Sequence, residues 1–518
     1  MKTMAITGKF LSRNLALAAV LGACVAWSAV DLVAQSAGQS GSQTSGSSSS
    51  AAQQAVGPST VQNAQKTLST VTAQQTPQPP QQAGQGDYRG SLIEGRSTGT
   101  VLDLSLDEAI ARGLRTNLGL ILQSSAEKSA AGQRLQTLQA LLPEVNGSAS
   151  YTVEQVNLAA FGLKFPGIKP IVGPFQIEDF RATLSQSLFN VPSMERYLAS
   201  KHNFQAARFT AEDARDLVVL TVGNAYLLCI ADGSRIEAVQ GQLATSKVSL
   251  DQAMAAHDAG TSPRLDVLRA QVDYQSQQQQ LISAQNSLAK DKLALARTIG
   301  LPLDQEFRTT DLAPYAALDH VDPNAAYAQA IASRKDLKAS SEQVKSAEAQ
   351  KIAAWAQQLP EAHFAGDFGD LGTTVTHSHS TYTATGEVTA PILQLAKTRG
   401  DVLVADASLQ QARARLSDRT QQVNADVRDA ILDIETAAKL VDATQSNLAL
   451  AKEALSEAQQ RFRSGVSDNL AVSQAQAQTS QANDQYISAL YQHNVAKLSL
   501  ARALGVADTN YKIYLGGK

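Results

Sequence analysis

Four segments of the chain, each about ten residues long, alternate between apolar and polar side chains. In the clearest one the odd positions are apolar or small and the even positions 146–154 are polar; the odd ones are Val145, Gly147, Ala149, Tyr151 and Val153. The same period recurs in residues 180–188, 361–368 and 381–390. A period of two predicts β-strands with one apolar face and one polar face.

Two longer stretches without internal proline predict long α-helices. Residues 192–263 carry proline only near their ends, and the chain after Pro391 carries none. The first stretch contains about 68 residues before Gly260, which as one helix would extend about 100 Å. Each stretch reaches a glycine followed by capping residues, GTSP at 260–263 and GVSD at 465–468, and a second helical pattern then begins. We therefore expect two helical hairpins that turn at Gly260 and Gly465.

The chain contains an internal repeat that covers both hairpins. Residues 243–300 align with 448–505 without a gap, at an offset of 205 (465 − 260). Upstream, the LPE of residues 142–144 aligns with that of 359–361 at an offset of 217 (359 − 142). The first copy is therefore 12 residues longer (217 − 205) between Glu144 and Leu188. We expect this insertion in an exposed loop.

The N-terminus has the pattern of a secretory signal. Basic residues precede an apolar run at 15–30 and small residues near 34, so residues 1–34 are predicted to be a signal peptide. Cys24 follows Leu-Gly-Ala, as in a bacterial lipobox, and is a possible lipidation site. Residues 35–100 begin as a Ser, Gln, Ala and Gly-rich run and are expected to be a disordered leader.

Export changes the interpretation of the alternating segments. Strands of about ten residues with one apolar face are what a transmembrane β-barrel requires, since its lumen accommodates the polar face. Four strands cannot close around a channel, and an open sheet edge in lipid would leave backbone groups unsatisfied. Other copies of the chain must therefore complete the barrel. No later segment is read as a membrane-spanning helix.

Several motifs recur in the order found in one known family. They are LSLDEAIARGLRTN at 104–117, NAYLLCIADGSRIEA in the first long helix, the two hairpin turns, LPEV and LPEA before the strands, API at 390–392 and the LARxxG endings. From about residue 102 to 505 the chain resembles TolC-like outer-membrane efflux proteins. The resemblance implies a fold that is mainly α with a small β part. Long α-helical hairpins would form a trimeric α-barrel tunnel, and four strands per chain would contribute to a 12-stranded transmembrane β-barrel.

The resemblance also implies partners and a mechanism. A homotrimer in outer-membrane lipid of a Gram-negative-type bacterium would act as a passive duct. A periplasmic membrane-fusion adaptor would dock on the hairpin tips, and an inner-membrane pump of the RND, ABC or MFS class would supply the energy. The predicted docking residues are Gly260, Thr261, Ser262, Leu265, Gly465, Val466, Ser467 and Leu470.

The tunnel entrance departs from the family pattern. Characterised members narrow the entrance with aspartates six and nine residues after the second tip glycine, where this chain has Ala471 and Gln474. The resemblance therefore leaves Asp266 and Asp468, with Arg461 and Arg463, as the candidate entrance charges. Solvated helix caps are the alternative interpretation of both aspartates.

The domain boundaries follow from the repeat. We expect a first duct repeat at 101–300, a connector at 301–322, a second repeat at 323–505 and a C-terminal tail at 506–518, after the signal peptide and leader.

Other functional classes find little support. The chain has no P-loop, HExxH, GxSxG or dinucleotide fingerprint, so no enzyme activity and no cofactor is expected. His363, His377 and His379 lack further ligand-type residues, so no metal site is expected. A net charge of −3 gives no indication of nucleic acid binding. Two alternatives remain, a periplasmic coiled-coil adaptor and a structural surface protein, because Leu281, Leu288 and Leu295 form a heptad seam typical of either.

Overall fold

The computed structural model describes residues 88–162, 166–311, 315–318, 321–464, 466–467 and 469–515. The predicted signal peptide, Cys24, Gly465 and Asp468 lie outside the described residues.

Two long helical hairpins dominate the described residues, as predicted. Helix α4 (Val191–Asp258, 68 residues) returns as α5 (Arg264–Ile299), and α8 (Leu395–Arg463) returns as α9 (Asn469–Ala503). The Asn190 side chain caps α4 by accepting a bond from Ser193 N, and Pro192 lies in the first turn, where its missing N–H costs nothing. Shorter helix pairs precede each strand pair: α2 (Leu106–Thr116) with α3 (Leu118–Gln139), and α6 (Pro323–Ser333) with α7 (Lys335–Ala356).

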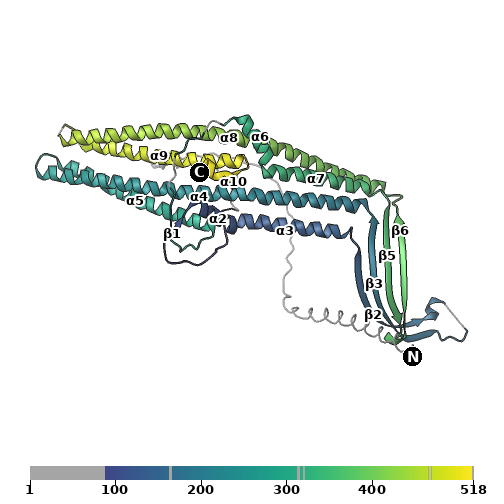
Figure 1. Cartoon of the computed structure of the whole chain (residues 1–518). Helices are drawn as coiled ribbons and strands as arrows, with labels where there is room; N and C mark the ends of the chain where they lie inside the picture. Colours follow the sequence, from purple (N-terminus) through teal and green to yellow (C-terminus); the bar gives the residue numbers. More distant parts are fainter. Residues whose placement is uncertain are drawn as a thin grey trace, which may run out of the picture. The chain divides into compact units, whose positions relative to one another are not determined.

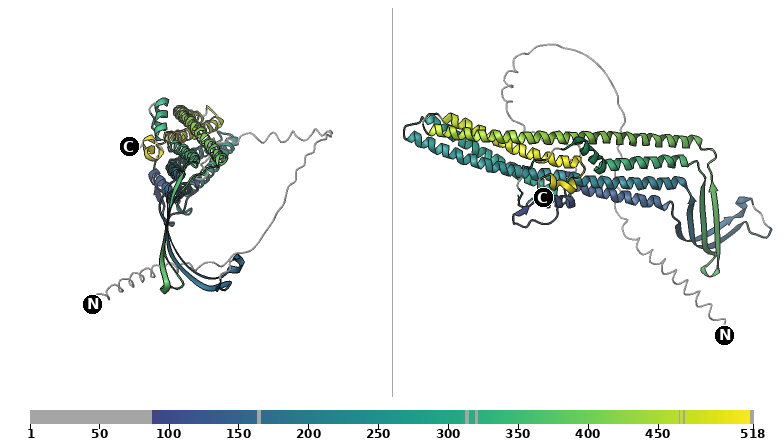
Figure 2. Two further views of the ribbon diagram at one scale, coloured as in Figure 1. Left: turned by 90° about the vertical axis from the view of Figure 1, so that its right-hand side faces the viewer. Right: turned by 45° about the horizontal axis from the view of Figure 1, so that its top comes forward.

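All four predicted strands are present in one antiparallel sheet of order β2-β3-β5-β6. The strands are β2 (Glu144–Asn157), β3 (Ile171–Phe189), β5 (Glu361–Gly372) and β6 (Ser378–Thr389). The β3–β5 pairing joins the two repeats. Strands β2 and β6 are the edges of the sheet, and no other strand in the described part of the chain pairs with their outer sides. Figures 1 and 2 show α3, α4, α7 and α8 side by side, with the sheet at one end and the hairpin turns at the other.

The extra length of the first copy lies in its strand hairpin. Strands β2 and β3 exceed β5 and β6 in length and are joined through the short 3-10 helix η2 (Leu158–Phe161), with an exposed Phe161. A second, two-stranded parallel sheet, which the sequence did not predict, pairs β1 (Leu102–Leu104) with β4 (Phe307–Thr309).

The apolar core lies midway along the long helices. Leu104, Val218, Val222, Tyr226 and Leu295 are fully buried where α2, α4 and α5 meet. Helix α4 therefore includes an 18-residue window of mean hydropathy 1.5, apolar enough to cross a membrane by composition alone. Half of that window is buried within the chain, so packing accounts for its composition.

The predicted disordered leader needs correction at its end, and the predicted tail contains a helix. Residues 88–100 belonged to the predicted disordered leader, yet Tyr88 is buried and the backbone N–H of Leu92 donates to Thr116 O at 2.9 Å. The predicted tail contains α10 (Ala507–Tyr514), where the Tyr511 hydroxyl donates to Asp107 Oδ1 at 2.7 Å. In both cases hydrogen bonds to helices remote in the sequence order the segment, although its own residues show no helix or strand period.

Candidate functional site

The first hairpin tip is a tight helix-terminating turn. Gly260 has φ +73°, and its N–H donates to His257 O at 2.8 Å. The N–H of Thr261 donates to Ala256 O at 2.9 Å, which completes a Schellman motif. Glycine is needed here because an L side chain is strained at this φ.

The second tip repeats this geometry as far as it is described. The N–H of Val466 donates to Arg461 O at 3.0 Å, the counterpart of the Thr261 bond at the offset of 205 (466 − 261). The described parts of the two tips therefore form equivalent turns.

The two tips contact one another through buried polar groups. Asn469, at the start of α9, is 2% exposed, and its side-chain amide donates to Asp266 O at 3.4 Å. The Asp266 carboxylate accepts a bond from Ser262 Oγ at 2.7 Å and lies 3.8 Å from the Arg269 guanidinium. Asp266 thus lies in the contact between hairpins, neither on an open surface nor as a solvated cap.

Apolar and basic side chains remain exposed on the same tips. Val466 is 69% exposed, Leu265 53% and Leu470 42%. Arg461 and Arg463, in the last turn of α8, are also exposed. This combination is typical of a surface that binds another protein, because isolated monomers bury most large apolar side chains.

The glycines of the two LARxxG endings form a second equivalent pair, at the opposite end of the returning helices. Gly300 and Gly505 have φ +72° and +70°. A Cβ on Gly300 would lie 2.7 Å from Thr116 Oγ1, and one on Gly505 would lie 2.9 Å from Arg334 N and Cα. Each glycine therefore lets a returning helix end against the break between two shorter helices of its own repeat.

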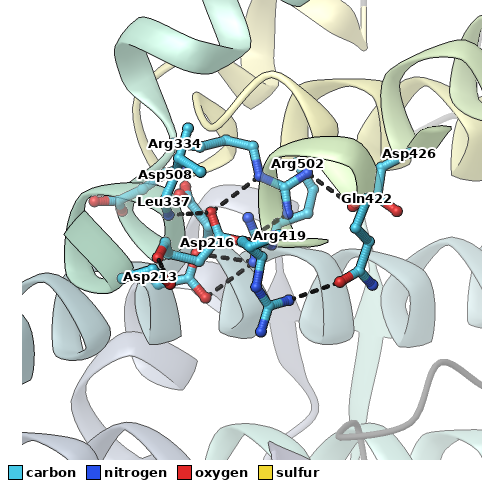
Figure 3. Close-up of polar contacts among 11 residues, drawn as sticks. Asp213, Asp216, Arg334, Leu337, Arg419, Gln422, Asp426, Arg502 and Asp508 are labelled. Carbon is cyan, nitrogen blue, oxygen red and sulfur yellow. Dashed lines mark hydrogen bonds and ion pairs between the residues drawn. The ribbon is translucent and has the colours of Figure 1, made fainter. Parts of the chain in front are cut away.

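Arg334, at the break between α6 and α7, is the centre of a buried ionic network (Figure 3). Its side chain is 5% exposed and donates to Asp336 Oδ2 at 2.7 Å and to Asp426 Oδ2 at 2.8 Å. Nearby, Arg502 Nη2 lies 2.8 Å from Asp213 Oδ1, which connects α9 to α4. The network therefore joins both long helices to the second repeat's short helices.

The same network also holds the C-terminal helix. Arg215 Nε donates to Asp508 Oδ2 at 2.8 Å. Asp508 N donates to Asp216 Oδ1 at 2.7 Å, and both aspartates are labelled in Figure 3. Thus α10 is fixed to α4 by charge-assisted bonds.

Burial and pairing act in opposite directions on these groups. Burial lowers the pKa of Arg334, but hydrogen bonds to Asp336 and Asp426 more than offset it, and the pKa is raised overall. Burial raises the pKa of Asp213 to about 6, although Arg502 opposes the shift. The pKa of the buried Asp213 carboxyl is therefore well above that of an ordinary aspartate.

Sequence reasoning did not select this network. Arg334 occupies the position equivalent to Asn117 (334 − 117 = 217), the neutral residue that caps α3 in the first repeat. The sequence offered one sign of the network: the second repeat has a charged residue, Arg334, where the first repeat has the capping residue Asn117.

The three histidines considered as metal ligands lie at opposite ends of the β5–β6 hairpin, with His363 near the helices and His377 and His379 at the turn. His377 Nδ1 forms a 3.0 Å hydrogen bond with Thr374 Oγ1. Across the described ranges, no three His, Cys, Asp or Glu side chains are grouped as metal ligands.

The fold and tips together define a class: a duplicated protein with long helical hairpins and an open antiparallel sheet between the helices of each repeat. Residues 121–301 and 326–506 each match the family described as Outer membrane efflux protein. The chain belongs to that family. The predicted resemblance, the mainly helical fold and the twofold repeat are thereby confirmed.

Individual relatives are distant in sequence. The chain is 24% identical to the pyoverdine export outer membrane protein OpmQ of Pseudomonas putida over 318 residues. That match spans 58% of this chain and 65% of OpmQ. The CmeC outer membrane channel of Campylobacter jejuni has a similar fold, with TM-score 0.69 and 17% identity, covering 81% of this chain and 92% of CmeC. The MtrE channel of Neisseria gonorrhoeae, in its open state, gives 0.67 and 19%, covering 80% and 94%.

Proposed function

We propose that the protein is a passive outer-membrane duct formed by three copies of the chain. The observation that carries this proposal is the four-stranded sheet, in which the outer sides of β2 and β6 are unpaired in the described part of the chain. In lipid each edge would leave unpaired N–H and C=O groups, and pairing β6 of one copy with β2 of the next removes that cost. Three copies would close a barrel of 12 strands (3 × 4).

The faces of the sheet support the same assembly. Register places large apolar side chains on one face, where they are exposed in the single chain: Val145 69%, Tyr151 59%, Phe180 45%, Phe368 62%, Tyr382 80% and Val388 73%. Exposed apolar side chains on this scale require lipid or protein cover. The opposite face is polar and would line a water-filled exit.

The hairpin tips are proposed as the site of adaptor docking. Leu265, Val466 and Leu470 supply apolar contact, and Arg461 and Arg463 supply charge. A periplasmic membrane-fusion adaptor would bind these turns and connect the duct to an inner-membrane pump. OpmQ is named for pyoverdine export. Our proposal for this chain is the coarser role, a conduit for whatever solute its pump delivers.

The assembly can be tested on protein extracted from outer membranes with detergent. We expect a heat-modifiable trimer that forms ion channels in planar bilayers. A soluble monomer without channel activity would contradict the proposal.

The entrance charges need a separate test. We propose that Asp266 and Asp468 contribute to ion selectivity, Asp266 by positioning the tips and Asp468 by its charge. Single-channel recordings of Asp266→Ala and Asp468→Ala should show altered conductance or selectivity. Unchanged conductance and selectivity in both variants would show that the two aspartates do not act at the entrance. The proposal of a trimeric duct would not be affected.

A further inference from the structure

Polar contacts hold the first hairpin to α9 between the core and the tips. Arg235 Nε lies 3.4 Å from Asp484 Oδ1, and Gln476 Nε2 donates to Ser249 Oγ at 3.1 Å. We call the contacts from Arg235 down to the tips the polar seam. A cavity of about 310 Å³ lies within it, between all four long helices. Side-chain atoms of Gln242, Gln277 and Asn483 in its lining are buried without a hydrogen-bond partner among the described residues.

A carboxyl pair lies at the core end of the polar seam, with Asp232 buried and Asp291 half-buried. Asp232 on α4 is 3% exposed, and its Oδ1 lies 2.8 Å from Arg235 Nη1. The carboxyl group of Asp291, on α5, lies against that of Asp232, and this contact helps to raise the pKa of Asp291. Two carboxylates in contact repel each other when both are ionised, so the pair favours one bound proton. Arg235 thus joins the carboxyl pair on one side to Asp484 of α9 on the other.

The second repeat shows that the fold does not require this pair. The equivalent positions are Ala437 (232 + 205) and Ala496 (291 + 205). Both alanines are buried in an apolar cluster between α8 and α9. Small uncharged side chains therefore suffice for the same helix contact, and the aspartates are specific to the first hairpin.

We propose that Asp232 and Asp291 form a proton-binding site, and that release of its proton weakens the Arg235–Asp484 bridge to α9. With the proton bound, the pair carries one negative charge. Without it, three carboxylates compete for Arg235, and the two on α4 and α5 repel each other. The proton therefore tightens the polar seam.

The other titratable groups around the pair leave Arg235 as its main counter-charge. On α5, Lys292 donates to Phe307 O at 2.8 Å. On α9, Tyr491 faces the pair with a pKa raised by its own burial, and Asp484 has a pKa raised by burial and lowered in part by Arg235. On α4, burial raises the pKa of Cys229 to about 12, so it stays a neutral thiol at ordinary pH.

Burial, together with the hydrogen bond to Asp232, raises the pKa of Asp291 to about 7. Because the folded chain holds this proton more tightly than the unfolded chain, the stabilisation is complete at acidic pH. It is lost as the pH rises from about 4 towards 7. The site would therefore titrate close to neutral pH.

Infrared titration of the full-length protein in detergent tests the proton directly. We expect a protonated-carboxyl band that disappears near neutral pH in the wild type and is missing in Asp291→Asn. Both are compared with Asp213→Asn added, which removes the other carboxyl whose pKa is raised to about 6. Asp251→Asn, at an exposed position of α4, the helix that carries Asp232, is the control and should keep the band. A wild type without the band, or a band that survives Asp291→Asn, would overturn the proposal.

Hydrogen exchange of α9, corrected for the intrinsic pH dependence, tests the consequence. We expect at least tenfold faster exchange around Asp484 at pH 8.5 than at pH 5.5 in the wild type, and no difference in Asp291→Asn. If that variant folds poorly, Asp232→Ala/Asp291→Ala copies the second repeat and should also be pH-independent. Equal pH dependence in wild type and variants would refute the coupling. Neither measurement requires a conducting channel, so loss of the duct proposal would show separately in bilayer recordings.

Discussion

Replacing Arg334 by methionine removes the positive charge at the centre of the ionic network while keeping most of the side-chain volume. Asp336 would remain, with 14% of its side chain exposed and its guanidinium partner gone. Asp426, at 38% exposed, would regain water easily. The main effect is therefore one uncompensated carboxylate between α4, α7 and α9.

The magnitude follows from these exposures. Breaking a buried ion pair by removing one partner costs about 3–5 kcal/mol. The exposed Asp426 arm adds at most about 1 kcal/mol. The double variant Arg334→Met/Asp336→Asn removes the stranded charge and keeps an amide oxygen for the Leu337 N–H, which now donates to Asp336 Oδ1 at 2.9 Å. It should recover most of the loss and lie within about 2 kcal/mol of the wild type.

Denaturant unfolding in detergent, followed by circular dichroism, measures these differences. Arg413→Met is the control, because its partner Glu348 is 42% exposed and Arg413 is 61% exposed. It should change the unfolding free energy by less than about 1 kcal/mol. A loss below about 1 kcal/mol for Arg334→Met, or a double variant as unstable as the single one, would refute the reasoning.

Three further predictions concern residues in or near the apolar core and the ionic network. Gly505→Ala should lower the free energy of unfolding by about 2–5 kcal/mol, because the backbone there is left-handed and the added methyl group would collide with Arg334. Gly132→Ala in α3, which has open space around it, is the control and should be neutral or stabilising in the same assay. Tyr226→Phe should cost about 1–3 kcal/mol, since its hydroxyl donates at 2.8 Å to Leu104 O and lies 2.8 Å from Asp311 Oδ2; an unchanged midpoint would argue against these bonds. Because burial raises the pKa of Asp213 to about 6, its contribution should decline as the pH rises from about 4 to 6, and a pH series of melting temperatures should show a smaller decline in Asp213→Asn.

The sequence predicted those parts of the molecule whose physical cause is local. Strands β2, β3, β5 and β6 were readable because a half-buried strand must alternate, and the hairpins because no proline interrupts α4 or α8. The turn at Gly260 was readable because only glycine fits its φ of +73° easily.

Long-range polar contacts were not readable in this way. Arg334 and Asp232 are charged residues that the sequence places on ordinary polar helix faces, and only the packing of several helices buries them. The segment around Tyr88 lacks periodicity because its order comes from backbone bonds to α2. Asp266 was predicted as an entrance charge, but Ser262 and the start of α9 enclose it, which the spacing along one helix could not reveal.

The two free edges of the sheet also have a genetic consequence. A chain altered only at β6 would still present an intact β2 to its neighbour, so it could enter an assembly that it cannot close. If the chain forms the proposed trimer, and altered and intact chains were made in equal amounts and mixed at random, roughly one trimer in eight would consist of intact chains alone. Such an allele would be dominant over the wild type, whereas one that prevents folding of the chain altogether would be recessive.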